Sequence, residues 1–279
     1  MTADVAALLG LVQGVFMFVP VSSSSHLALT QHWLERRGVD VPSPDSPEAI
    51  LLNLVLHVGT LVSVVVVMRR TLARLVRDGV AETRDPGTRF GTGPAQRFLL
   101  MVLLATAVTG VLGLGVREVA PFFLGSPVVV AAMLVLTGVV LWWTDRARPG
   151  DRETPGVRVA LGVGVAQAIA LLPGLSRSGL TIAAGLALGM RRAQAAELSF
   201  VLAIPTILAA TAVQVLDVAG SGNGVGVPGS SLVVGFVVAA VSGTAALLLV
   251  LRLLLAARFR VFSVYVWALA VVVLVLEVA

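Results

Sequence analysis

The chain contains neither cysteine nor lysine, and charged residues make up only 13% of its 279 residues. Without cysteine there is no disulfide, no thiol nucleophile and no thiolate metal site. Every basic side chain other than histidine is therefore an arginine. Hydrophobic residues make up 57% of the chain, and the mean hydropathy of +0.98 is typical of an integral membrane protein rather than a soluble one.

The net charge of +5 does not indicate nucleic-acid binding, because the arginines lie in short segments between apolar runs. Most of them fall in four segments that we expect to share the cytoplasmic side: the 69–97 loop and residues 146–152, 191–192 and 252–260. The other side has fewer: Arg36, Arg37, Arg117 and the arginine-free loop 218–230. Because cytoplasmic loops carry an excess of arginine, we expect both termini to lie outside the cytoplasm.

The stretch Pro173-Gly-Leu-Ser-Arg-Ser-Gly-Leu-Thr181 is polar, although apolar runs flank it at 157–172 and 182–190. Neither run reaches the ~20 residues that a transmembrane helix needs. Broken, polar backbone at membrane depth is tolerated only where it is buried in protein or lines a wet cavity. We therefore predict a re-entrant helical hairpin over about 157–190, broken at Pro173-Gly174.

The tip of this predicted hairpin has the features of an anion site. Ser176 is positioned to cap the second helix, whose positive N-terminal end would face the same place as the Arg177 guanidinium. An arginine fork, the hydroxyls of Ser176, Ser178 and Thr181 and a helix N-terminus together favour phosphate. The alternative is an interfacial Arg177 that extends to the lipid headgroups.

Residues 4–34 repeat this pattern, with a break at Pro20 and a hydroxyl cluster, Ser22–Ser25, followed by His26. The serines are expected to donate to phosphate oxygens or to supply a nucleophile; alternatively they only cap helices and satisfy backbone groups. His26 is a candidate nucleophile or general acid–base, or a packing histidine. His57, inside an apolar span, either lines the same cavity or bonds a neighbouring helix.

Two glutamines, Gln13 and Gln167, occupy matching places before the two breaks, which suggests an internal repeat. We expect them to contact substrate or to bridge the hairpins. Spans are predicted at about 49–68, 98–116 and 123–143, and again at about 195–215, 231–251 and 259–278. Since three spans change sides, the second half would be inverted relative to the first, in an inverted-repeat architecture.

The predicted fold is thus an all-α polytopic membrane protein with one integral membrane domain. Its first repeat covers 1–150 and its second 151–279, and each contains one re-entrant hairpin and three transmembrane helices. No acidic pair falls on either hairpin, which argues against a metal site built only from carboxylates and against a proton-relay pump.

Several motifs resemble those of the undecaprenyl-diphosphate phosphatase family, the bacitracin-resistance type of bacterial membrane phosphatase. The 173–181 stretch is similar to its PGxSRSxxT signature, and Gly185-Leu-Ala-Leu-Gly-Met190 and Ser199-Phe-Val-Leu-Ala-Ile-Pro205 match its GxxLG and SFLLAIP stretches. Phe18-Val-Pro-Val-Ser-Ser-Ser-Ser-His26 resembles FLPVSSxxH, and Leu56-His-Val-Gly-Thr60 also fits. The resemblance runs nearly from end to end.

The resemblance implies an enzyme of the bacterial plasma (inner) membrane that converts a C55 polyprenyl diphosphate to the monophosphate carrier of cell-wall synthesis. It maps Ser23 and His26 to catalytic positions, and we expect Arg177 to stabilise the transferring phosphoryl group. The expected substrate-binding residues are Gln13, Ser22, Ser24, Gly174, Ser176, Ser178, Thr181 and Gln167. The expected partners are the lipid substrate and the bilayer, and a homodimer is an alternative to a monomer.

One position departs from the family pattern, since Met17 stands where the family's (E/Q)GxxE motif has its second acid. A thioether is a weak acceptor that suits neither Mg²⁺ nor Ca²⁺. A divalent ion, if used, would be held through the substrate phosphates, and no organic cofactor is expected. The alternative function is a non-hydrolytic flippase or binding protein for polyprenyl phosphate.

Overall fold

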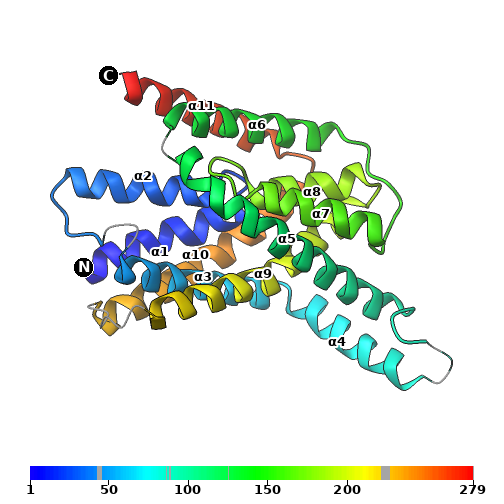
Figure 1. Ribbon diagram of the computed structural model, residues 1–279. Coiled ribbons are helices and arrows are strands. Elements are labelled where there is room, and N and C mark those ends of the chain that lie inside the picture. The colour runs from blue at the N-terminus through cyan, green and yellow to red at the C-terminus, as the bar shows by residue number, and fades with distance from the viewer. Residues whose placement is uncertain (43–45, 86, 88, 125, 221–226, 279) are drawn as a thin grey trace. The chain divides into compact units, whose positions relative to one another are not determined.

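The computed structural model describes residues 1–42, 46–85, 87, 89–124, 126–220 and 227–278, so part of the 218–230 loop lies outside it. Within these ranges the chain forms eleven α-helices and, apart from an isolated bridge between Arg152 and Met190, no β-structure (Figure 1). The helices are α1 (Ala3–Phe18), α2 (Ser23–Arg36), α3 (Pro47–Val67), α4 (Arg69–Arg84), α5 (Pro94–Leu124), α6 (Pro127–Arg146), α7 (Val157–Ile169), α8 (Arg177–Ala187), α9 (Arg192–Gly220), α10 (Gly229–Leu255) and α11 (Arg260–Val278).

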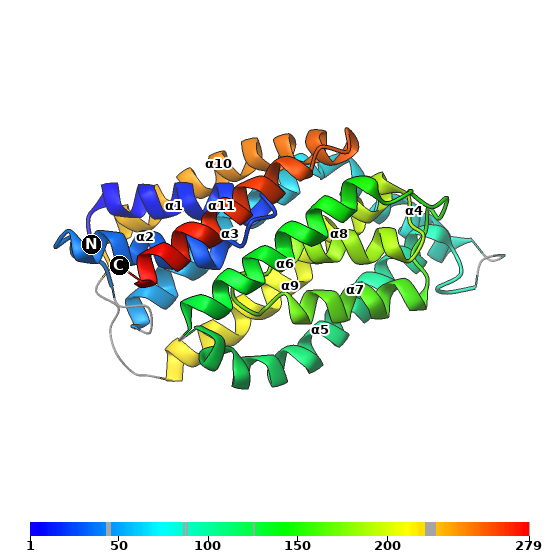
Figure 2. The ribbon, with the colours of Figure 1, turned by 90° about the horizontal axis from the view of Figure 1, so that it is seen from above.

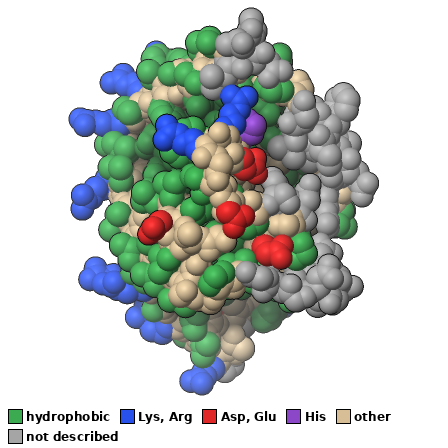
Figure 3. Space-filling model, turned by 90° about the vertical axis from the view of Figure 1, so that its left-hand side faces the viewer, with side chains coloured by type: hydrophobic (Ala, Val, Ile, Leu, Met, Phe, Trp, Pro, Cys, Tyr) green, Lys and Arg blue, Asp and Glu red, His purple; other side chains and the backbone are tan. Residues whose placement is uncertain are grey.

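Five of these helices, α3, α5, α6, α9 and α10, are long and apolar enough to cross a membrane. They coincide with five of the six predicted spans, and the apolar α11 coincides with the sixth. Large apolar side chains face outward from them; Val111 is 72% exposed and Val241 67%. Hydrophobic side chains also cover much of the face drawn in Figure 3. The prediction of an all-helical, multi-pass membrane protein is confirmed.

Four shorter helices occur as two pairs, at the segments predicted to form hairpins. The α1 and α2 helices have 16 and 14 residues and are separated by residues 19–22. The α7 and α8 helices have 13 and 11 residues and are separated by residues 170–176. The members of each pair pack against one another, so both predicted helix–break–helix patterns are present.

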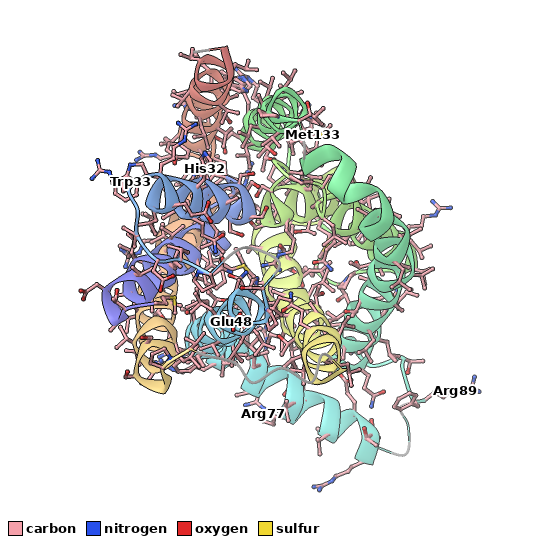
Figure 4. All side chains as sticks on the ribbon, turned by 60° about the vertical axis from the view of Figure 1, so that its left-hand side comes forward. His32, Trp33, Glu48, Arg77, Arg89 and Met133 are labelled. Atoms are coloured by element: carbon pink, nitrogen blue, oxygen red, sulfur yellow. The ribbon has the colours of Figure 1, made fainter. Side chains whose placement is uncertain are left out.

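The prediction that residues 69–97 form a loop is wrong, because this segment contains α4 and the first turn of α5. Leu75 and Gly79 of α4 are buried, and Glu82 accepts the backbone amides of Ala95 and Gln96 at 3.0 and 2.9 Å. One α4 side chain thus caps the N-terminus of α5. In Figure 4, Arg77 lies on α4, and Arg89 lies beyond its end with its side chain directed away from the helices.

The described chain divides into two compact units. Unit 1 consists of residues 1–19, 23–67 and 203–250, and unit 2 of residues 20–22, 68–202 and 251–279. Each unit therefore draws on segments from both halves of the sequence. The inverted repeat predicted for residues 1–150 and 151–279 stays a prediction.

Unit 1 is organised by close packing of α1 and α3 on α10. A Cβ added at Gly10 would lie 2.5 Å from the carbonyl oxygen of Gly235, and one at Gly59 would lie 2.7 Å from that of Phe236. Such short distances leave room only for glycine. The apolar core of this unit includes residues from α1, α2, α3 and α10: Val5, Leu9, Leu27, Leu34, Leu52, Leu56 and Ala239.

Unit 2 contains α4 to α8, the first turns of α9 and all of α11. Figures 1 and 2 show α6 alongside α11 and α7 alongside α8. Asp145, in the last turn of α6, accepts the amides of Phe259 and Arg260 at 2.8 and 2.7 Å and so caps α11. The Trp267 indole donates back to the Val135 carbonyl at 3.1 Å. These contacts make α6 a fixed support for its neighbours.

Candidate functional site

In unit 2, the break between α7 and α8 is a tight turn that ends at the cap of α8. The amides of Leu171, Leu172 and Leu175 bond carbonyls three residues earlier, at 3.1, 3.0 and 3.2 Å. Gly174 has a φ of 87°, and a Cβ there would lie 2.6 Å from the Val130 carbonyl oxygen. Both the conformation and the close approach require glycine. Gly174, predicted to contact substrate, thus has a clear role in the backbone of the turn.

Ser176 is the N-cap of α8, as predicted from the sequence. Its Oγ accepts the amide of Gly179 at 3.2 Å and lies 3.5 Å from the Ser178 Oγ. Both serines are buried. Since the first amides of a helix have no acceptor within it, the start of α8 is a local source of positive potential beside Arg177.

Arg177 is the first residue of α8, and its side chain is half-buried. Its Nη2 nitrogen is fully buried, yet no described residue offers it a hydrogen-bond acceptor. A buried donor without a partner is costly, and such donors are rare in folded proteins. The combination of an unmatched guanidinium N–H and a helix N-terminus is suited to an anion that the structure does not itself supply.

Thr181 lies one turn further along α8, where its Oγ1 donates to the Arg177 carbonyl at 2.8 Å. The same oxygen lies 2.6 Å from the Oγ of Ser199, on α9. Either hydroxyl can donate in this pair. Ser199 lies in the Ser199–Pro205 stretch, and its contact with Thr181 was not predicted from the sequence. The contact attaches α8 to the first turns of α9.

Gln167, on α7, is completely buried and donates from Nε2 to the Thr109 Oγ1 at 3.0 Å. Thr109 lies 3.0 Å from the Gly164 carbonyl. Together these bonds tie α7 to α5. They show a structural role for Gln167, while the contact with substrate stays a prediction.

In unit 1, the side chain of Gln13 on α1 forms a hydrogen bond with the side chain of His57 on α3. The Nδ1 of His57 lies 2.7 Å from the Asn53 carbonyl, which can only accept, so Nδ1 carries the proton. In the neutral ring, Nε2 is then an acceptor, and it lies 3.2 Å from the Gln13 Nε2. The second contact of the Gln13 amide is the Met17 sulfur, at 3.6 Å. Gln13, Met17 and His57, three residues singled out from the sequence, are thus brought together.

His26 is buried near the start of α2 and stacks on Phe16, with ring centroids 3.8 Å apart and planes 21° apart. The stack fixes the plane of the imidazole. Ser22 precedes α2 with a φ of 68°, in the left-handed region. Ser23 is half-buried and Ser24 exposed. Within the hydroxyl cluster, Ser23 and Ser24 are therefore the more accessible candidates.

Among the described residues there is no group of three His, Asp or Glu side chains able to hold a metal ion. At position 17, where a carboxylate would be useful, the chain offers a soft sulfur that accepts from Gln13. The described residues thus offer no cluster of carboxylates of the kind that Mg²⁺ and Ca²⁺ prefer.

Comparison with known proteins shows similarity along almost the whole chain. Residues 6–272 match the family described as bacitracin resistance protein BacA. The chain is 48% identical to the undecaprenyl-diphosphatase of Alkalilimnicola ehrlichii over 273 residues, covering 95% of this chain and 93% of that protein. It is 47% identical to the undecaprenyl-diphosphatase of Halorhodospira halophila, covering 97% and 96%. Identity to that of Desulfosudis oleivorans is 37%, covering 95% of each chain.

The hydrogen bond between Thr181 and Ser199 predicts energetic coupling of the two side chains. Thr181→Val and Ser199→Ala are each expected to lower stability, and the double variant to lose less than their sum, by about 1 kcal/mol. Unfolding in detergent measures all three. As a control, Thr106→Val removes a hydroxyl that bonds its own helix at Val102, and its effect should add to that of Ser199→Ala. Additive losses for the Thr181 pair would contradict the assignment.

Proposed function

The chain belongs to the family of bacitracin resistance protein BacA, and we infer that it is an integral membrane phosphatase. Its substrate is undecaprenyl diphosphate, which it hydrolyses to the monophosphate and inorganic phosphate. The relatives named undecaprenyl-diphosphatase, up to 48% identical over nearly the whole chain, support this reaction. Recycling of the lipid carrier of cell-wall synthesis is the corresponding role in the cell.

The observation that carries the site assignment is the buried Nη2 of Arg177, which lacks an acceptor among the described residues. A phosphate oxygen supplies the missing acceptor. The N-terminus of α8 and the hydroxyls of Ser176 and Ser178 add donors beside it. In phosphoryl transfer most of the catalysis is positioning and charge stabilisation, which this group of donors provides. Substrate contacts from Thr181, Gly174, Gln167, Gln13, Ser22 and Ser24 remain part of the proposal.

Hydrolysis joins a water oxygen to the terminal phosphorus and breaks the bond from that phosphorus to the bridging oxygen, which leaves on the monophosphate. Two routes use the residues of the first helix pair. In one, His26 takes the proton of the attacking water. In the other, the Ser23 Oγ attacks first, and water then cleaves the phosphoserine. The fixed plane of His26 supports the first route, and the accessibility of Ser23 allows the second.

For the membrane topology, we propose that the two short helix pairs are re-entrant hairpins of an inverted repeat. Helices of 11 to 16 residues are shorter than the ~20 needed to span. The clustering of arginine supports a cytoplasmic position for α4 and extracytoplasmic termini.

We expect Arg177→Ala to lower phosphate release from undecaprenyl diphosphate by at least ~10³-fold, because the transferring charge loses its principal cation. Purified protein in detergent provides the assay. Arg158→Ala, which removes an exposed arginine of α7, should leave turnover unchanged. Turnover that survives Arg177→Ala would remove this residue from the mechanism.

Met17→Glu tests both the metal requirement and the non-hydrolytic alternative. We expect the native protein to release phosphate. In Met17→Glu, the rate of phosphate release should differ more between added Mg²⁺ or Ca²⁺ and added chelator than it does in the native protein, because a carboxylate can ligate these ions. Met17→Gln supplies a polar control without the charge. If the native protein binds the lipid but releases no phosphate, and Met17→Glu does release it, the chain is a carrier or binding protein instead.

The absence of cysteine makes the topology directly testable, since one introduced cysteine is the only thiol in the chain. In intact cells, a membrane-impermeant maleimide is expected to label Thr2→Cys. Arg84→Cys, at the exposed end of α4, should react only after the membrane is opened. Labelling of Arg84→Cys in intact cells, with Thr2→Cys protected, would reverse the proposed orientation.

A further inference from the structure

Thr137 lies in the middle of α6, a transmembrane helix, and is completely buried. No feature of the sequence distinguishes it from the other threonines of the spans. In the structure, however, it sits behind the turn that carries the phosphate-binding residues. All the groups in this arrangement belong to unit 2.

The Thr137 hydroxyl bonds both sides of that turn. Its Oγ1 donates to the Gly174 carbonyl at 2.9 Å and accepts the Ser176 amide at 3.2 Å. Two other threonines of unit 2 behave differently: Thr106 and Thr144 each donate to a carbonyl four residues earlier in their own helix. Thr137 directs its proton to the neighbouring turn.

Other residues of α6 also contact the turn and limit the space at Gly174. A Cβ added at Gly174 would lie 2.6 Å from the Val130 carbonyl oxygen and 2.7 Å from the Cβ of Met133, which is labelled on α6 in Figure 4. The turn therefore rests directly on α6. Within this contact, Thr137 contributes the side-chain hydrogen bonds that set the position of the turn along the helix.

The position of the turn decides where the anion-binding groups point. Ser176 is the cap of α8, and Arg177 follows it directly. When the Ser176 amide is held by Thr137, the cap oxygen, the first amides of α8 and the start of the Arg177 side chain are held with it. Displacement of a catalytic group by about 1 Å commonly lowers a rate by ~10²-fold.

We propose that Thr137 is a positioning residue for phosphate recognition, acting through the Gly174–Ser176 turn on Arg177. The proposal rests on the proposed phosphatase function, in which Arg177 binds the diphosphate. Thr137 itself does not touch the substrate. Its hydroxyl bonds the Gly174 carbonyl and the Ser176 amide, and in doing so fixes the start of α8.

The test compares three variants. Thr137→Val keeps the shape and removes the hydroxyl, Thr137→Ser keeps the hydroxyl, and Thr144→Val removes an equally buried hydroxyl from the same helix. For undecaprenyl diphosphate, kcat/KM should fall by about 30- to 100-fold in Thr137→Val. It should stay within about threefold of the native value in the other two. The rescue by serine separates the hydroxyl from general packing.

Hydrogen–deuterium exchange of peptides covering 173–180 gives a second readout that needs no turnover. Exchange there should be at least about tenfold faster in Thr137→Val than in native protein, Thr137→Ser or Thr144→Val, because the Ser176 amide has lost its acceptor. If native protein has no turnover, the phosphatase assignment fails, and exchange alone decides the role of Thr137. Unchanged exchange, or turnover in Thr137→Val within threefold of native, overturns the proposal.

Discussion

A helix that breaks inside an apolar protein leaves amides and carbonyls that water does not reach, and each of them needs a partner. At the break between α7 and α8, partners for these groups come from the turn itself and from α6. Three of its amides bond within tight turns, and Pro173 has no amide to satisfy. Thr137 then takes the Gly174 carbonyl and the Ser176 amide. None of these bonds uses the Arg177 guanidinium, whose buried Nη2 remains available for a ligand.

Burying the Arg177 Nη2 without an acceptor lowers the stability of the fold, and other contacts have to offset this loss. In unit 2 these include contacts that are polar but local: Asp145 capping α11, Glu82 capping α5 and Gln167 bonding Thr109. Each joins two helices through a side-chain hydrogen bond. Such contacts order the helices before any anion binds, and order that exists before binding lowers the cost of binding.

Length and hydropathy were enough to predict the spans, and the polar stretch at 173–181 was enough to locate the break and the Ser176 cap. Length and hydropathy did not predict α4, because the many arginines of residues 69–97 indicated a polar loop. The spacing of Leu72, Leu75 and Gly79 was the available signal for a helix with one packed face. Thr137 and Ser199 could not be identified as partners of the turn and of Thr181. A single hydroxyl in an apolar helix does not reveal which neighbour it faces.

Met17 bears directly on how the first helix pair takes part in the reaction. With a thioether at position 17, the Gln13 amide contacts the Met17 sulfur and the His57 Nε2, and Asn53 sets the tautomer of His57. The position carries no negative charge. Phosphoryl transfer depends chiefly on cations and dipoles around a phosphate that is already negative. Arg177 and the α8 N-terminus provide such groups without any contribution from position 17, so hydrolysis is compatible with methionine there.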